Sequence, residues 1–255
     1  MRGRYFFVVG LISAALLLVS GTTRAGETTL TLTSAGDLVD SGIYVGPYTA
    51  KITGGSTIQI ICDNYDTPAS SIPWSATLIT FPTTSSGIAT FANEVKFGDT
   101  SKNPNVSRFG TPPSAATVLQ DYEAAAWLAQ QLMADYDKLK PGSSAANTQL
   151  DKQIGDLDFA LLAIFSSSAR HSAGFDSGAL ADYNLALSQT YSLGEFSNVE
   201  IWTPNPLNAS QEYFTMLPSP ELPSAILFGT GLLGIGFVTR RMRRNSAIQI
   251  QESRL

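Results

Sequence analysis

The sequence predicts an α+β fold: a strand-rich amino-terminal half, two to three amphipathic helices, two further strands, and one carboxy-terminal transmembrane helix. Three observations predict this order. β-Branched residues dominate short segments such as TLTLT (29–33) and TIQIIC (57–62). Apolar residues recur every three or four positions between residues 115 and 164. An apolar run over 222–239 precedes a group of arginines. Because strands do not alternate with helices, a parallel doubly wound sheet is not expected.

The strands of the amino-terminal half are delimited by turn-forming residues. Gly54-Gly55 makes a turn between two of them, and Pro73 introduces a third. Residues 82–114 are rich in Thr, Ser, Asn and Pro and are expected to form a loop around a short strand. The expected strands of this half are 29–33, one that follows Tyr48 and ends at Ile52, 57–62, 74–81 and a short one near 91–97.

The helices follow from the spacing of the apolar residues. A first helix of about six turns is predicted from Ala115 to Leu139, and Pro141-Gly142 ends it. A third, shorter helix spans roughly 177–189, and strand character returns at 198–203 and 212–217. The second helix, between these, carries one apolar face made by Leu150, Ile154, Leu157, Leu161 and Ile164.

The amino terminus has the pattern of a secretory signal peptide. Arg2 and Arg4 precede an apolar segment from Phe6 to Val19, and Thr23-Arg24-Ala25 places small residues before Gly26. This predicts a signal peptide over 1–25 with cleavage after Ala25. A retained amino-terminal anchor is the alternative. Residues 26–217 are then expected to form one exported α+β domain, which is long enough to bury a core.

The charge and the composition limit the partners and the chemistry. Residues 26–223 carry 8 of the 16 basic and 20 of the 21 acidic residues, a net charge of −12. A domain this acidic repels phosphate backbones, so nucleic acid is not an expected partner. The single cysteine, Cys62, excludes an intrachain disulfide. The single histidine, His171, excludes a multi-histidine metal site, and no cofactor is expected.

The carboxy terminus combines a Pro-rich hinge, an apolar run and arginines. From Leu222 to Thr239 the run is 18 residues long, which just meets the length that a membrane-spanning helix needs. The arginines predict that this end stays in the cytoplasm, with 245–255 as a cytoplasmic tail. A buried core helix is the alternative.

Residues 218–244 resemble the PEP-CTERM sorting signal of Gram-negative bacteria. That signal joins a Pro-Glu-Pro motif, a Gly- and Leu-rich helix and an arginine cluster, and FGTGLLGIGF stands here for the helix. Leu222 occupies the third motif position. The resemblance implies recognition by an exosortase, cleavage near the motif, and export to the cell surface or matrix. The matching motif residues are Pro220, Glu221, Pro223, Arg240, Arg241, Arg243 and Arg244.

Three groups of residues suggest chemistry, and each has a simpler interpretation. His171 lies near Ser166-Ser167-Ser168, but without a nucleophile elbow a lone surface histidine is favoured over a hydrolase triad. Asp63, Asn64 and Asp66 lack the alternating spacing of a calcium loop, so a turn is favoured. A glycan site and a core are the two alternatives for the tryptophans, and the core is favoured for all three: Trp74, Trp127 and Trp202.

A second resemblance covers most of residues 42–217. The segments that carry it are YVGPY, ICDNY, WSA, YEAAAWLAQQL, DLDFALLAIF, VEIWTPNP and QEY. They look like the body domain of PEP-CTERM surface proteins, and distantly like bacterial surface thioester domains. In those domains a strand cysteine is joined to a helix glutamine, and the bond is attacked by nucleophiles on a target surface.

In this sequence Cys62 matches the cysteine, whereas Asp158 stands in place of the glutamine. An aspartate cannot form the bond by releasing ammonia, so the two residues are interpreted as a relic pair that lies close in space. A buried cysteine that packs as a small hydrophobe is the alternative.

Together these observations predict a non-enzymatic, exported bacterial surface or extracellular-matrix protein. The expected partners are an exosortase, the membrane and exopolysaccharide. An adhesin-like module that uses the Cys62 region is the first alternative, and a secreted hydrolase with His171 as base is the second.

Overall fold

The computed structural model describes residues 27–36, 38–67, 69, 71–98, 113–139 and 144–217. The chain divides into two units, Met1–Met216 and Leu217–Leu255, so that the fold described below is that of the first unit. The predicted signal peptide, transmembrane helix, sorting signal and tail lie outside the described residues. Within the described ranges, no helix combines the length and the apolar character that a membrane crossing requires.

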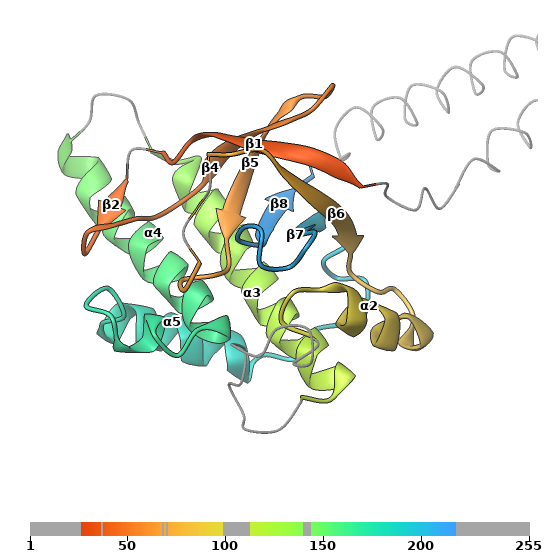
Figure 1. The fold of residues 1–255 in the computed structure, drawn as a ribbon. Helices are drawn as coiled ribbons and strands as arrows, with labels where there is room; N and C mark the ends of the chain where they lie inside the picture. Colours follow the sequence, from red (N-terminus) through yellow and green to blue (C-terminus); the bar gives the residue numbers. More distant parts are fainter. Residues whose placement is uncertain are drawn as a thin grey trace, which may run out of the picture. The chain divides into compact units, whose positions relative to one another are not determined.

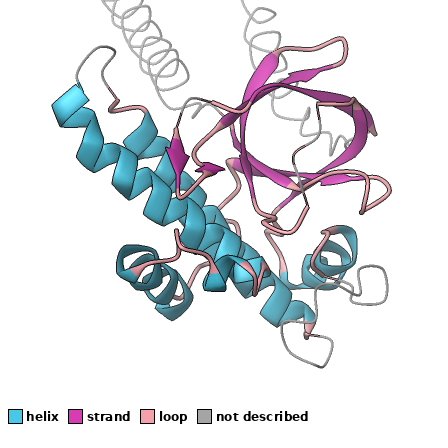
Figure 2. Cartoon of the chain, turned by 60° about the vertical axis from the view of Figure 1, so that its left-hand side comes forward, coloured by secondary structure: helices cyan, strands magenta, loops and turns pink. Residues whose placement is uncertain are grey.

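Six strands close into an antiparallel barrel, which Figure 2 shows as a ring. Their order around the barrel is β1-β4-β5-β8-β7-β6, so β8, the last strand among the described residues, lies between β5 and β7. The mixture of strands and helices and the strand-rich first half were predicted, whereas the closure was not. The barrel strands are β1 (Thr28–Ser34), β4 (Tyr48–Ile52), β5 (Thr57–Cys62), β6 (Trp74–Thr80), β7 (Val199–Pro204) and β8 (Tyr213–Met216).

Alternation along the strands separates two apolar cores. On β5, Ile60 and Cys62 belong to one buried cluster while Ile61, between them, belongs to the other. This follows from the period of two in a strand, which sends successive side chains to opposite faces. The first cluster draws on all six strands and therefore fills the barrel. Its strand members are Leu30, Tyr48, Ala50, Ile60, Cys62, Trp74, Ala76, Trp202 and Tyr213.

The second core lies between the barrel wall and the helices (Figure 1). The two long helices, α3 (Ala115–Tyr136) and α4 (Ser144–Phe165), pack against each other, and α5 (Ser177–Ser188) packs on α4. Ser114 caps α3 by accepting a hydrogen bond from the Thr117 N–H at 3.1 Å. Short 3₁₀ turns, η1 (Ser85–Gly87) and η3 (Ala169–His171), complete the helical part.

One local prediction was wrong, and one small element was not predicted. The short strand expected near 91–97 is instead a helix, α2 (Ile88–Glu94), followed by a turn. Phe91, Ala92 and Val95 are buried at helical spacing, but seven residues are too few for that period to be evident in the sequence. The ribbon formed by β2 (Val39–Asp40) and β3 (Ile43–Tyr44) was not expected either.

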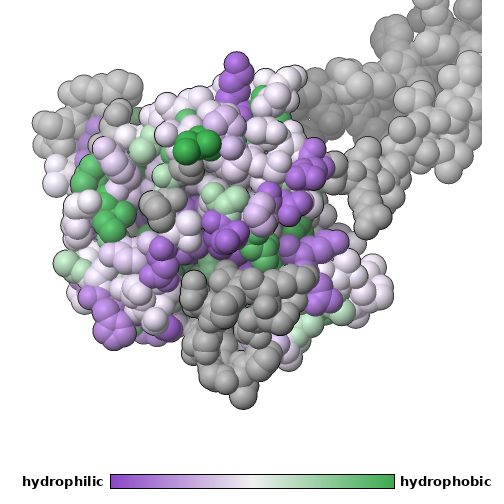
Figure 3. Space-filling model, viewed as in Figure 1, coloured by the Kyte–Doolittle hydropathy of each residue, from purple (hydrophilic) through white to green (hydrophobic). Residues whose placement is uncertain are grey.

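The face of the molecule in Figure 3 is mostly polar or neutral, with a few separate apolar residues. Val39 and Tyr44, which are paired on the β2–β3 ribbon, are among the exposed large apolar side chains of the described domain. Scattered apolar residues of this kind are normal on soluble proteins and need no partner to explain them.

Candidate functional site

The thiol of Cys62 lies at the end of β5, inside the barrel. The side chain is 4% exposed, and its Sγ accepts a hydrogen bond from the Asn64 N–H and donates one to the Asn64 carbonyl oxygen, both at 3.3 Å. Burial raises the pKa of the Cys62 thiol well above its ordinary value, and the Asp63 and Asp158 carboxylates raise it further. Because the thiolate is the nucleophilic form, this environment suppresses reaction at Cys62.

Asp158 projects from α4 one turn before Leu162, which joins the apolar cluster of the barrel interior. Its Oδ2 accepts a hydrogen bond from the Gly46 N–H at 2.7 Å, and its Oδ1 is buried without a hydrogen-bond partner. Burial raises the pKa of Asp158 to about 7. The carboxyl group of Asp158 therefore lies in an apolar environment.

Tyr48 on β4 lies near both Cys62 and Asp158. Burial raises the pKa of its phenol, and Cys62 and Asp158 both contribute to the increase. Tyr213 on β8 packs edge-on against Tyr48, with 6.4 Å between the ring centroids. The predicted Cys62–Asp158 pair thus lies within one electrostatically linked group, while its interpretation as a relic cross-linking site stays a prediction.

A second buried polar cluster adjoins the first, because Asp63 follows Cys62 in the chain. Glu212 lies at its centre: the hydroxyls of Tyr122 and Thr203 donate to its carboxylate, and the Lys96 N–H donates to Oε2 at 2.9 Å. Asp63, Lys96 and Glu212 are at most 2% exposed. We call Asp63, Lys96, Tyr122, Thr203 and Glu212 the carboxylate cluster.

The carboxylate cluster was missed by sequence reasoning, although Asp63 was considered as a calcium ligand. Its members come from the end of β5, the turn after α2, α3, β7 and the residue before β8. Because these residues are far apart along the chain, no short sequence motif contains them together. The one available signal is that Lys96 and Glu212 lie within otherwise apolar segments, VKF and EYF.

The turn predicted for the CDNYD segment is present. Asn64 Oδ1 accepts a hydrogen bond from the Asp66 N–H at 2.9 Å, which is the Asx geometry that such a turn requires. In the described part of the chain, no group of three or more His, Cys, Asp and Glu side chains is placed to hold a metal ion.

Of the other candidate residues, His171 belongs to neither cluster. It is exposed, and its Nδ1 lies 2.7 Å from the Ser167 carbonyl oxygen. Trp74 and Trp202 both belong to the buried cluster inside the barrel, as expected of core residues, whereas Trp127 packs half-buried against the helical core. The sorting residues fall outside the described residues: Pro220, Glu221, Pro223, Arg240, Arg241, Arg243 and Arg244.

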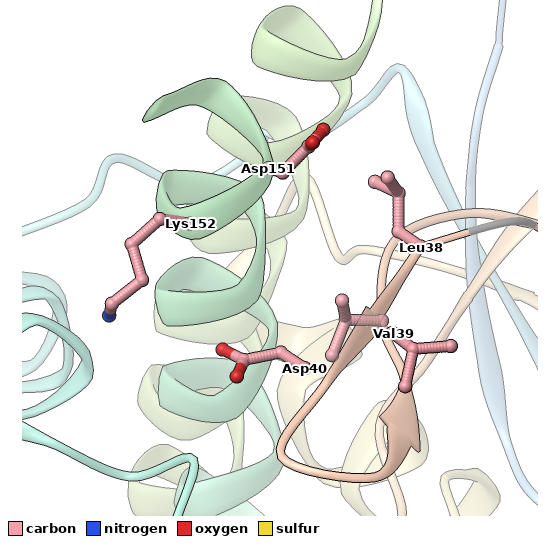
Figure 4. A pocket seen from close by; sticks show the side chains of 6 residues that line it. Leu38, Val39, Asp40, Asp151 and Lys152 are labelled. Atoms are coloured by element: carbon pink, nitrogen blue, oxygen red, sulfur yellow. The ribbon is translucent and has the colours of Figure 1, made fainter. Parts of the chain in front are cut away.

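A pocket of about 380 Å³ opens between the β2–β3 ribbon and α4. Figure 4 shows the Asp40 side chain pointing from the ribbon toward α4, which carries Asp151 and Lys152. Lys152 is already paired with Asp156 and with Asp176, the latter at 2.8 Å. The carboxylates of Asp40 and Asp151 are therefore the principal polar groups available to a ligand. The pocket is lined by Leu38, Val39, Asp40, Val45, Asp151 and Lys152.

Comparison with known proteins gives distant structural matches alone. No family model matches the sequence, and no curated protein matches it. The N-terminal thioester domain of fibronectin-binding protein SfbI from Streptococcus pyogenes is similar with a TM-score of 0.35 and 8% identity. The N-terminal domain of the Streptococcus pyogenes pilus tip adhesin Cpa has the same TM-score and 10% identity. Each match covers 78% of this chain and 97% of the other.

Proposed function

We propose that this chain is a non-enzymatic, exported bacterial surface or extracellular-matrix protein, which an exosortase sorts through residues 218–244. The observation that carries the proposal is the extent of the described barrel along the sequence. β1 begins at Thr28, directly after the predicted cleavage site at Ala25, and β8 ends at Met216, directly before the Pro-rich hinge. Both strands belong to one barrel, so one closed domain occupies the interval between the two targeting patterns.

The intact mass of the protein from its native host tests this proposal, with a strain that lacks the exosortase as the control. A species that starts at Gly26 and ends between Pro220 and Pro223, present only in the wild type, is expected. A species that starts at Gly26 and keeps Leu255 in both strains would instead show a permanently anchored membrane protein. A species that keeps residues 1–25 would refute the signal peptide.

The partner we propose is a hydrated polysaccharide of the matrix. The acidic charge of the domain disfavours anionic polymers, whereas carboxylates accept hydrogen bonds from neutral sugar hydroxyls. The pocket between the β2–β3 ribbon and α4 offers Asp40 and Asp151 for this purpose. Replacing both by Asn should weaken retention on the host's own exopolysaccharide, and Asp137→Asn, outside the pocket lining, should not. Equal retention of both variants would refute this location.

An adhesin-like module that uses Cys62 is the second candidate, and the electrostatic effect of Asp158 on the thiol supports it. Reaction of the native protein with a thiol reagent distinguishes this candidate from the leading proposal. A sealed, protonated thiol reacts slowly until the domain unfolds, which is the expected result for the leading proposal. Rapid labelling of Cys62 in the folded protein would favour the adhesin.

A further inference from the structure

The carboxylate cluster contains an amine and an acid that are both poorly satisfied. Lys96 is 2% exposed, and its Nζ, which has three hydrogens to donate, forms one described hydrogen bond, to the Ser210 carbonyl oxygen at 2.7 Å. Asp63 is fully buried, no donor reaches its carboxyl oxygens, and the Glu212 carboxylate lies beside it within hydrogen-bonding range of a protonated Asp63. Buried polar groups are nearly always paired, so the two together need an explanation.

Glu212 holds these two residues in one place. The Asp63 N–H donates to the Glu212 carbonyl oxygen at 3.2 Å, and the Lys96 N–H donates to the Glu212 carboxylate at 2.9 Å. Tyr122 and Thr203 fix that carboxylate from α3 and β7. The Lys96 amine, the Asp63 carboxyl and the Glu212 carboxylate also lie close enough to interact electrostatically, so an amine and two carboxyl groups share one buried site.

We propose that Lys96 and Asp63 condense to an intramolecular amide that links the turn after α2 to the end of β5. The lone pair of the neutral Lys96 Nζ attacks Cγ of the protonated Asp63 carboxyl. The N–Cγ bond forms and the Cγ–OH bond breaks. Glu212 accepts a proton from the nitrogen and delivers one to the departing hydroxyl, which leaves as water. No group is oxidised or reduced.

The environment favours the two protonation states that this reaction needs. Burial lowers the pKa of the Lys96 amine. Burial raises the pKa of Asp63 well above its ordinary value, and the neighbouring Glu212 carboxylate raises it further. Both shifts move the pair away from the ammonium and carboxylate forms, which do not react with each other.

Two further arguments support the bond. The amide replaces two buried ionisable groups by one neutral group, which removes the cost of leaving them unpaired. Enclosing both groups in one buried cluster also raises their effective concentration above that of free reactants. Among the described residues, no ion pair joins Lys96 and Asp63. The flexible Lys96 side chain therefore has to move its Nζ from the Ser210 carbonyl oxygen to Cγ of Asp63.

The intact mass of the purified full-length chain tests the inference, after correction for any processing at the ends. Folded protein should be lighter than its sequence by one water, and digestion should give a branched peptide that joins residues 63 and 96. Lys96→Arg and Asp63→Ala should each restore the full mass, and Glu212→Gln should slow the loss of water. A wild-type protein with its full sequence mass would overturn the proposal whether or not these variants fold.

A thioester between Cys62 and Asp158 would also remove one water, and two controls separate it from the amide. Cys62→Ala should keep the mass deficit, because Cys62 takes no part in the amide. Hydroxylamine should leave the deficit unchanged, since it cleaves thioesters and not amides. A deficit that disappears under either control would refute the Lys96–Asp63 bond and assign the link to Cys62.

Discussion

Asp158 Oδ2 accepts a hydrogen bond from the backbone N–H of Gly46 at 2.7 Å, across 112 residues of sequence. The bond fixes the loop that leads into β4 to the middle of α4. Gly46 has a φ of 87°, and a Cβ there would lie 3.3 Å from Ile154 of the same helix. The carboxyl group therefore supports a close approach of loop and helix that only glycine permits without strain.

Asp158→Ala should destabilise the domain by about 1–3 kcal/mol, because it leaves the buried Gly46 N–H without an acceptor. The free energy of unfolding in urea measures this change. Asp151→Ala, on the same helix and only partly buried, is the matched control and should cost less than about 0.5 kcal/mol. Equal values for the two variants would show that the Gly46 bond contributes little.

Stability should fall as the pH rises from about 4 to about 7. Burial raises the pKa of Asp158 from 3.8 to about 7, so the folded state binds more protons than the unfolded state in this interval. The stabilisation by protonated Asp158 is fully present below the pKa of the unfolded state, 3.8. It is lost as the pH rises through the pKa of the folded state, about 7. Cys62 and Tyr48, which face Asp158, have raised pKa values and stay protonated throughout.

Asp158→Asn isolates this effect, since the amide keeps an oxygen for Gly46 but does not titrate. The melting temperature of the wild type relative to Asp158→Asn should decrease steadily across the interval. Two parallel curves would show that Asp158 ionises normally in the folded protein.

The elements that the sequence predicted are those with a strong local signal. The β-branched residues in 57–62 and the three–four spacing in 115–139 both correspond to observed elements, β5 and α3. Barrel closure was not predicted, because pairs such as Leu30 with Trp74 and Ile61 with Phe214 depend on contacts between distant segments. Lys96 was missed for the same reason: its partners, Ser210 and Glu212, are more than 100 residues away.

Glu212→Ala should destabilise the domain by about 3–5 kcal/mol, because it leaves three buried donors without an acceptor: the Lys96 N–H and the hydroxyls of Tyr122 and Thr203. Thermal and urea unfolding both measure the loss. Glu200→Ala on β7, whose side chain is half-buried, is the control and should cost far less. A mild effect at Glu212 would show that the network is dispensable for folding.

Gly98→Ala should destabilise the domain by at least about 1–3 kcal/mol through overpacking. A Cβ at this position would lie 1.7 Å from the Ala92 carbonyl oxygen, and backbone atoms cannot move aside as a flexible side chain can. The turn that carries Lys96 would have to shift away from α2. At Gly87 the nearest contact of a Cβ is 3.1 Å, to Pro82, so Gly87→Ala is the control and should be tolerated. Similar urea midpoints for both variants would contradict this account.

The position of β8 bears on how such a chain crosses a membrane. It is the last described strand along the chain, yet it fills the gap between β5 and β7. In an exported protein the wall stays open until residues 213–216 have emerged from the translocation channel. Until then β5 and β7 present unpaired edges, which are sites of aggregation. If the domain is exported as proposed, this strand order delays closure of the barrel until export of the domain is almost finished.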